Sequence, residues 1–428
     1  MIEMSVAGVA QTLDKAKLDS LFEGLDINNK AMGSIAISKN GNVLYSKTIG
    51  YSYIDQKLLS NENTKYRIGS VSKIFTAVII LQLVEEGRLI LSNTLNNYFP
   101  KFPNSNNITI SMLLNHRSGI SNMTHIRSRE VPRTQSEMVT ILAKKKSQFR
   151  PGTKAVYSNS NFLLLGYIIE KVCHKPYKDV LKERITSALG LINTYYGQET
   201  IAENNECFAY KRFKNWEQRP QTDLSIPGGS GAIISTPMDM VRFIEALFSG
   251  KLVTQSSLDE MQTMVDGYGM GLGEFEFDAK KAIGHTGGID GYESVLAYFP
   301  VDSLAIAYCT NGRAYPTEDV VIGALNIYFN KVYFIPDFTV TTIQAKHLSR
   351  YTGLYLSKET PLRIVIEKDK KALVARTIGF PTYKLTAISP LLFKCDIASV
   401  LIQFDRRKKS MKLKRDSMGF TFTKTGIK

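Results

Sequence analysis

The longest apolar run in the chain covers residues 74–84, and Glu85, Glu86 and Gly87 end it. Eleven residues are too few to span a bilayer, so the pattern predicts a buried helix with a glycine stop. Ser70 then lies at or near the helix N-terminus, where unpaired N–H groups favour developing negative charge. Lys73 follows one turn later on the same face. Burying a lysine on a helix face costs free energy unless the charged group has partners. The position of Lys73 is therefore the first indication of a chemical role.

The rest of the N-terminal half alternates between strand and helix patterns. Residues 11–24 predict an amphipathic helix, and residues 33–38 and 43–45 around Asn40-Gly41 predict a hairpin. Residues 66–68 lead in extended form into Gly69. Between residues 89 and 197 the pattern is mainly helical, with segments at 110–115, 135–143, 161–172 and 177–185.

The sequence pattern changes after residue 228. A Gly-rich cluster at 228–232 lacks the strand–turn–helix context of a dinucleotide fingerprint, so that interpretation is discarded. Ser235-Thr236-Pro237 is a typical helix start and predicts a helix over 238–248. Strands are expected at 291–298 and 303–310, and a helix at 317–333.

Pro336-Asp337 marks a predicted linker. Short alternating runs follow it and predict an antiparallel meander that closes into a small barrel or sandwich. The runs are 362–367, 372–378, 383–388, 391–395, 400–404, 410–414 and 419–423. We therefore expect two domains, residues 1–335 and residues 345–428.

The net charge of +15 is concentrated at the C-terminal end. From residue 340 onward there are 19 Lys and Arg against 6 Asp and Glu, a net of +13, which leaves +2 for the rest. Such charges usually solvate strand faces or meet acidic polymers, and no aromatic-interleaved RNA motif is visible, so nucleic-acid binding is not expected.

Cysteine and histidine give no sign of a metal site or a disulfide framework. The four cysteines are far apart and are expected to be buried thiols, and the five histidines lack zinc-ligand spacing. No metal and no cofactor are expected. No apolar segment reaches transmembrane length, and residues 1–13 do not form an intact signal peptide. The chain is expected to be periplasmic or secreted from a bacterium with its leader removed, and the cytoplasm stays open.

Two further motifs support a functional role for Ser70 and Lys73. In the first, Tyr157 and Asn159 open the helix expected from residue 161. A tyrosine can act as a general base if a cation such as Lys73 lowers its pKa, and the Asn159 amide suits a substrate amide or ester. Taken alone, the motif is better explained by structure, with Tyr157 as a core aromatic and Asn159 as a helix cap.

The second motif is Gly284-His285-Thr286-Gly287-Gly288, at the head of a strand-rich segment. Its glycines leave room for a substrate backbone to lie along a strand edge. The backbone amide of Gly288, paired with that of Ser70, is a candidate oxyanion hole. Taken alone, the segment is a Gly-rich turn with a surface histidine.

Together the three motifs resemble the serine β-lactamase and penicillin-binding-protein superfamily. The elements are Ser70-x-x-Lys73, Tyr157-x-Asn159 and His285-Thr286-Gly287, in the variant of the class C branch. That branch also holds D-alanyl-D-alanine carboxypeptidases, D-aminopeptidases and family VIII esterases. Flanking segments 113–120, 228–231 and 284–291 agree, and the resemblance spans residues 13–333.

The resemblance implies an α/β fold, with an antiparallel sheet flanked by helices and an all-helical region between the first two motifs. It implies that Ser70 becomes acylated and that Lys73 and Tyr157 move its proton, in a division left open. Asn159, His285, Thr286 and Gly287 would bind substrate. Residues 351–355 resemble the start of lipocalin-like barrels that often follow such domains.

His285 departs from the lysine that many β-lactamases hold at this position. Histidine is largely neutral at pH 7 and attracts a substrate carboxylate less than lysine does. The expected function is therefore hydrolysis of an amide or ester in a small molecule or peptide, with peptidase, esterase and weak β-lactamase open. The alternative is a penicillin-recognising sensor that is acylated without turnover. The oligomeric state is left open.

Overall fold

The computed structural model describes most of the chain in two compact units, Ala31–Val321 and Met1–Lys30 with Ile322–Lys428. The described residues are 13–123, 126, 128–213, 215–333, 335–336, 345–370, 372–377, 382–389, 391–395, 400–405, 407–415 and 418–425. The expected division of the chain at residues 335–345 stays a prediction.

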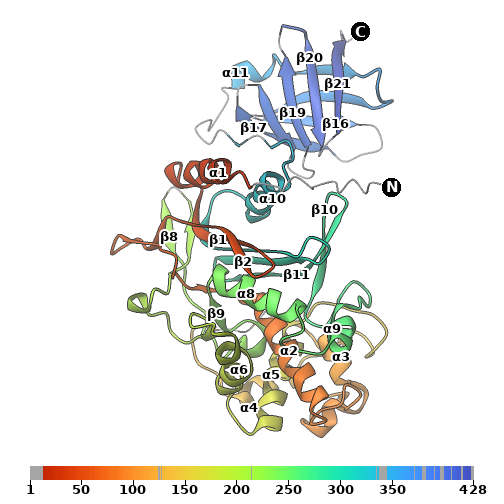
Figure 1. Cartoon of the computed structure of the whole chain (residues 1–428). Coiled ribbons are helices and arrows are strands. Elements are labelled where there is room, and N and C mark those ends of the chain that lie inside the picture. Colours follow the sequence, from red (N-terminus) through yellow and green to blue (C-terminus); the bar gives the residue numbers. More distant parts are fainter. Residues whose placement is uncertain are drawn as a thin grey trace, which may run out of the picture. The chain divides into compact units, whose positions relative to one another are not determined.

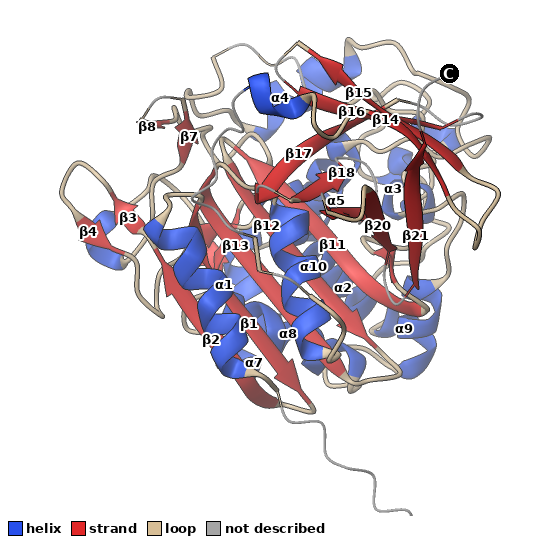
Figure 2. Cartoon of the chain, turned by 90° about the horizontal axis from the view of Figure 1, so that it is seen from above, coloured by secondary structure: helices blue, strands red, loops and turns tan. Residues whose placement is uncertain are grey.

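The larger unit is built on a six-stranded antiparallel sheet with the order β10-β11-β12-β13-β1-β2 (Figure 2). Because β1 pairs with β13, the N-terminal hairpin and the later meander join into one sheet. The strands are β1 (Ala31–Lys39), β2 (Asn42–Ile49), β10 (Gly273–Phe277), β11 (Lys280–Ile289), β12 (Tyr292–Phe299) and β13 (Leu304–Arg313).

Helices of this unit lie against the sheet and next to it (Figure 1). Helix α8 packs on β1, β12 and β13, while α5 contacts α2, α3, α4 and α6 in the helical region. The helices are α2 (Ser72–Glu85), α3 (Ile110–Leu114), α4 (Gln135–Ala143), α5 (Asn159–Cys173), α6 (Tyr177–Leu181), α7 (Ser187–Leu189), α8 (Pro237–Phe248) and α9 (Gln255–Gln262). The apolar run at 74–84 thus forms the middle of α2, which is buried almost throughout.

Short strands connect the sheet to the helical region. The small sheet β5-β9-β6 carries the chain from β5 straight into the turn that holds Ser70. The short strands are β3 (Tyr51–Tyr53), β4 (Leu58–Leu59), β5 (Tyr66–Arg67), β6 (Tyr195–Tyr196), β7 (Tyr210–Arg212), β8 (Trp216–Gln218) and β9 (Ile233–Ser235).

The smaller unit contains a closed barrel of eight antiparallel strands in sequence order. Its interior is an aromatic cluster in which Phe404 contacts Tyr351, Tyr355 and Phe393. The strands are β14 (Gly353–Leu356), β15 (Arg363–Asp369), β16 (Ala372–Thr377), β17 (Tyr383–Ser389), β18 (Leu392–Cys395), β19 (Val400–Asp405), β20 (Ser410–Arg415) and β21 (Met418–Thr425). This unit also holds α1 (Lys15–Ile27) and α11 (Ala345–Leu348), and α10 (Thr317–Tyr328) crosses the boundary.

The predicted fold class is confirmed. The sequence placed residues 284–288 at the head of a strand-rich segment, with a Gly-rich turn as the alternative, and the structure places them inside β11. A Cβ atom at Gly284 would overlap the carbonyl oxygen of Leu296 on β12, and one at Gly287 would overlap that of Ile68. The glycines that hide the strand pattern are therefore required by close packing.

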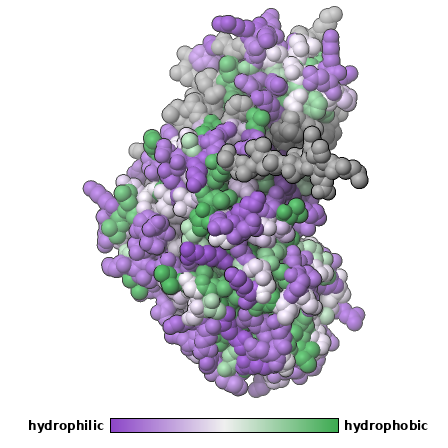
Figure 3. All heavy atoms as spheres, in the orientation of Figure 1, coloured by the Kyte–Doolittle hydropathy of each residue, from purple (hydrophilic) through white to green (hydrophobic). Residues whose placement is uncertain are grey.

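No helix in the described part of the chain is long and apolar enough to cross a membrane. On the face shown in Figure 3, hydrophobic residues of the larger unit lie scattered among hydrophilic ones. All four cysteines are free thiols, and Cys207, Cys309 and Cys395 are buried as expected, whereas Cys173 is only partly buried.

Candidate active site

Residues of the first two motifs meet at the hydroxyl of Ser70. The Oγ atom of Ser70 lies 2.9 Å from Nζ of Lys73 and accepts a hydrogen bond of 2.8 Å from the Tyr157 hydroxyl. Ser70 sits in a single 3-10 turn, Gly69–Val71, that runs directly into α2. Its side chain is partly exposed, whereas Lys73 is fully buried, so a substrate can reach the hydroxyl but not the amine.

The hydrogen-bond partners of Lys73 among the described residues are all oxygen atoms. Besides Ser70, its Nζ atom donates to Oδ1 of Asn159 and to the carbonyl of Ser230, each at 2.8 Å. Burial lowers the pKa of Lys73 well below that of an ordinary lysine. A neutral amine has two N–H groups and one lone pair, so Asn159 and Ser230 can take the two hydrogens while the lone pair faces Ser70.

The Gly-rich cluster that the sequence could not explain brings the Ser230 carbonyl to Lys73. It forms a 3-10 turn, Gly228–Ser230, whose backbone approaches α5 closely. A Cβ atom at Gly229 would lie 2.8 Å from the carbonyl oxygen of Phe162. Thr76 on α2 donates 2.6 Å to the Gly229 carbonyl and fixes the turn from the other side.

Tyr157 is held by two aromatic residues that sequence reasoning missed. His116 lies with its ring centroid 4.5 Å from that of Tyr157, and Tyr268 lies 6.3 Å away. Burial raises the pKa of Tyr157 to about 12, although the hydrogen bond to Ser70 opposes the shift. We expected Lys73 to lower this pKa; the desolvation of the phenol outweighs any such effect. Tyr157 is therefore a proton donor at neutral pH.

His116 supports the Tyr157 loop through its backbone. Its Nδ1 atom accepts a hydrogen bond of 3.2 Å from the amide of Ser158. Burial, with Lys73 and His285 as nearby positive charges when protonated, lowers the pKa of His116 well below its usual value. A neutral ring with Nδ1 as acceptor fits this role. The segment 113–120 that carries the resemblance contained the signal for this residue, whereas Tyr268 had none.

Asn159 contributes directly to the Lys73 site. It is the first residue of α5, and its amide N–H donates 3.2 Å to Oδ1 of Asn122. Since its Oδ1 accepts from Lys73, its Nδ2 group is the part that a substrate can use. The sequence predicted that Asn159 contacts the substrate. The structure adds a hydrogen bond from Lys73 to Asn159 that positions the amine, which the sequence did not suggest.

The third motif lies along an edge of β11 beside Ser70. Pairing of β11 with β10 ends at Gly284, so His285, Thr286, Gly287 and Gly288 pair only with β12 among the described strands. This free stretch is where an extended substrate could add as a strand. Thr286 is exposed on it and Gly287 is partly buried.

Gly288 and the Ser70 turn approach each other closely. Gly69 has φ of 50°, in the left-handed region, and a Cβ atom there would lie 2.7 Å from the Gly288 amide nitrogen. Only glycine fits both demands. The amide of Gly288 thus lies next to the nucleophile turn, as a shared oxyanion hole with the Ser70 amide requires.

His285 faces Tyr157 with a ring separation of 6.0 Å. Its Nδ1 atom contacts the Thr286 carbonyl. Burial first and the Lys73 charge second lower the pKa of His285 to about 4. The ring is therefore neutral at pH 7, and burial is the larger cause of its lowered pKa.

The described residues contain no group of three or more His, Cys, Asp or Glu side chains that could hold a metal ion.

Comparison with known proteins finds relatives that are named as penicillin-binding proteins. A penicillin-binding protein of Bacillus subtilis (strain 168) is 25% identical over 389 residues, covering 82% of this chain and 86% of the relative. A second relative from that strain is 32% identical over 243 residues, and the chain spans 61% of its length.

Solved structures agree with this picture. A D-stereospecific amidohydrolase from Streptomyces sp. is similar with a TM-score of 0.64 and 27% identity, over 73% of this chain and 98% of that one. A D-amino acid amidase from Ochrobactrum anthropi SV3 is similar with a TM-score of 0.65 and 25% identity, over 74% and 99%. These neighbours support a hydrolase or a penicillin-binding-protein-like role. The sequence also matches the Beta-lactamase family over residues 18–327, and the chain belongs to this family.

Proposed function

We propose that the chain is a serine hydrolase that cleaves amide or ester bonds through an acyl-Ser70 intermediate. The observation that carries the proposal is the buried Lys73 amine 2.9 Å from Ser70 Oγ. An amine whose pKa is strongly lowered by burial can take a proton at neutral pH, which an exposed lysine cannot do.

Acylation starts when Lys73 Nζ takes the proton of Ser70 as Oγ attacks the substrate carbonyl. The carbonyl oxygen becomes an oxyanion that accepts hydrogen bonds from the amides of Ser70 and Gly288. When the C–N or C–O bond breaks, Tyr157 donates its phenol proton to the leaving group. Lys73 has then gained one proton and Tyr157 has lost one, so transfer from the ammonium to the phenolate restores both groups.

Deacylation repeats the sequence with water in place of Ser70. A water molecule attacks the ester carbonyl and gives one proton to Lys73, and the other stays on the acid that forms. The Ser70 oxygen leaves with the proton that Lys73 took up, which restores the hydroxyl and the neutral amine. The net reaction adds one water across the amide or ester. The roles of Asn159, Thr286 and Gly287 in this scheme are to orient the substrate along the β11 edge.

The substrate class follows from the neighbours and from His285. Two of the solved neighbours are named as a D-amino acid amidase and a D-stereospecific amidohydrolase. A neutral His285 offers little attraction to the carboxylate of a penicillin. We therefore propose D-amino-acid amides or peptides first, neutral esters next and β-lactams last.

The test is a turnover screen with Ser70→Ala as the control. Nitrocefin, p-nitrophenyl acyl esters and D-amino-acid p-nitroanilides would be compared, and a fluorophosphonate adduct would be mapped by mass spectrometry. Turnover that is lost in Ser70→Ala, with a single adduct on Ser70, supports the proposal. An adduct elsewhere, or full activity in the variant, contradicts it. A burst of one equivalent without turnover would favour the sensor alternative.

A further inference from the structure

A cationic cavity of about 610 Å³ opens in the larger unit beyond the end of β11. Its walls come from β7, the loop after β8, the β11–β12 turn and the end of β13. It is lined by Arg129, Glu130, Tyr210, Lys211, Arg212, Arg219, Pro220, Thr222, Asp290, Gly291, Glu293 and Arg313. Five of these residues carry positive charge and three carry negative charge.

Ion pairing leaves the cavity with a positive excess. Glu293 pairs with Arg313 at 2.5 Å. Asp290 pairs with Arg67, which is not one of the lining cations. Within the described part of the chain, no ion pair involves the other four lining cations, Arg129, Lys211, Arg212 and Arg219. Glu130 alone remains to oppose them, so the lining favours an anionic ligand.

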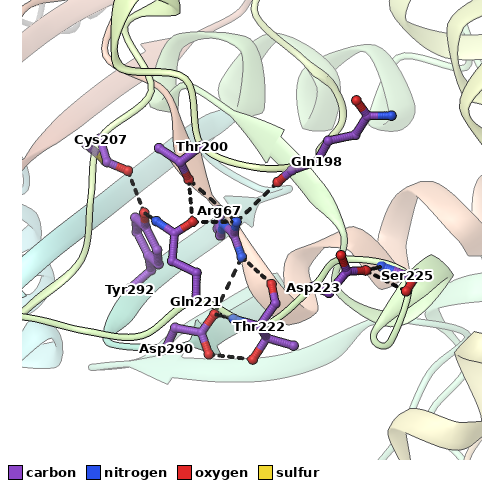
Figure 4. Close-up of polar contacts among 10 residues, drawn as sticks. All are labelled: Arg67, Gln198, Thr200, Cys207, Gln221, Thr222, Asp223, Ser225, Asp290 and Tyr292. Carbon is purple, nitrogen blue, oxygen red and sulfur yellow. Dashed lines mark hydrogen bonds and ion pairs between the residues drawn. The ribbon is translucent and has the colours of Figure 1, made fainter. Parts of the chain in front are cut away.

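Asp290 holds the wall in place rather than neutralising the cavity (Figure 4). Its carboxylate accepts from the amide and the hydroxyl of Thr222, at 2.8 and 2.7 Å. It also lies 3.5 Å from Arg67, a buried residue that donates 2.6 Å to the Thr222 carbonyl. These bonds fix the loop before β9 against the β11–β12 turn.

The same network ties the cavity to the catalytic residues. Arg67 precedes Ser70 by three residues, and Asp290 follows Gly288 by two. Asp290 is the first residue after β11, so the cavity wall begins two residues along the chain from the Gly288 amide that lies next to the Ser70 turn.

The direction along β11 distinguishes the two ends of a substrate. Tyr157, which would protonate the leaving group, faces His285. The leaving group then lies toward His285, and the acyl part extends from Gly288 toward Asp290. The cavity is thus on the acyl side of the bond that is cleaved.

We propose that this cavity binds a carboxylate carried on the acyl part of the substrate. The inference rests on the proposed hydrolase function and adds a substrate class to it, acyl donors with a second acid group. Lys211 lies on β7, and Arg219 directly follows β8, the strand that pairs with β7. Both side chains are exposed, and neither has an ion-pair partner among the described residues, so they can contact a carboxylate without loss of a native ion pair. Two such contacts, each worth slightly more than twofold at an exposed site, give about fivefold in kcat/KM.

The experiment compares mono-p-nitrophenyl esters of dicarboxylic acids with p-nitrophenyl esters of monocarboxylic acids of the same chain length. The readout is the ratio of kcat/KM, acidic over neutral, at each length and at low and high salt. The variant is Lys211→Gln combined with Arg219→Gln. The matched control is Lys251→Gln, which removes an exposed charge outside the cavity lining.

We expect the ratio of kcat/KM, acidic over neutral ester, to exceed one in the wild type at one favoured chain length. This ratio should fall about fivefold in the double variant and stay unchanged in the control. A ratio near one at every length overturns it and leaves the Ser70 hydrolase intact. An equal fall in Lys251→Gln also overturns it, because the effect would then come from net charge. Failure to hydrolyse either ester, together with no Ser70 adduct, removes the proposed function and the inference together.

Discussion

The Nζ atom of Lys73 lies 2.9 Å from Oγ of Ser70, in a site whose burial lowers the pKa of the amine. Its other partners, Asn159 and the Ser230 carbonyl, are acceptors, so no anion offsets the cost of a buried charge there. Tyr157 has the opposite character, because burial raises its pKa to about 12. In the proposed mechanism, these opposite shifts suit Lys73 to act as the base and Tyr157 as the acid.

The first prediction concerns the pH dependence of acylation. Only neutral Lys73 can take the Ser70 proton, so kcat/KM for a neutral ester should fall as the pH falls through the pKa of Lys73. That pKa should lie well below about 10.4, the value of an unperturbed lysine. A pH–rate profile measures it directly. A profile that rises only above about pH 10 would contradict a neutral Lys73.

The second prediction is a pH dependence of stability that Lys73 causes. In the unfolded chain Lys73 keeps its proton up to about pH 10.4, whereas the folded chain has lost it. The unfolded state then binds more protons, so the free energy of unfolding rises with pH in this window. Relative to Lys73→Met, the wild type should gain up to about 1.4 kcal/mol per pH unit. Urea unfolding at several pH values measures the difference, and parallel curves would refute it.

The third prediction separates the acid role of Tyr157 from simple packing. Tyr157→Phe should lower kcat by about 10²–10⁴, with little change in KM, because the ring is kept and the proton donor is lost. The loss should be larger for an anilide or alkyl amide than for a p-nitrophenyl ester, whose leaving group departs as an anion. An equal loss for both substrates would indicate that Tyr157 does not protonate the leaving group.

Much of the fold and the three motifs could be predicted from the sequence, because each is encoded locally. The apolar run of α2, the β1–β2 hairpin and the alternating strands of the barrel follow simple periods. Strand β11 could not be found this way, since Gly284 and Gly287 weaken the strand pattern while close packing requires them. The low strand propensity of glycine argues against a strand at these positions, but the close packing of the backbone requires glycine, and the packing determines the structure.

The supporting residues of the site could not be predicted for a different reason. His116, Ser230 and Tyr268 come from segments far apart in the sequence and act through contacts that no local pattern records. The same holds for Arg67, whose hydrogen-bond partners Thr222, Gln198 and Gln221 lie 131–155 positions away. Sequence patterns identify the groups proposed to react, and the three-dimensional structure shows which residues contact and position them.

The fourth prediction tests the packing of β11. Gly287→Ala should cost about 2 kcal/mol or more and reduce activity, because its Cβ atom would overlap the Ile68 carbonyl and the Ser294 hydroxyl. Gly273→Ala in neighbouring β10 is the control, since its nearest neighbour would be 3.8 Å away. It should stay within about 0.5 kcal/mol of the wild type. Thermal melts and ester turnover measure both, and equal costs would show that β11 has room for a side chain.

The last prediction concerns the choice of substrate by His285. Because its pKa is lowered to about 4, the ring carries no charge at pH 7 and gives a substrate carboxylate little attraction. His285→Lys would place a cation on the β11 edge and should raise kcat/KM for penicillins over that for neutral p-nitrophenyl esters about fivefold, the worth of one salt bridge of about 1 kcal/mol at a partly wet site. His285→Gln, which keeps the site neutral, should leave the ratio unchanged. If the lysine variant shows the ratio of the glutamine variant, the side chain at residue 285 does not face the substrate carboxylate, and preference must be set elsewhere along β11.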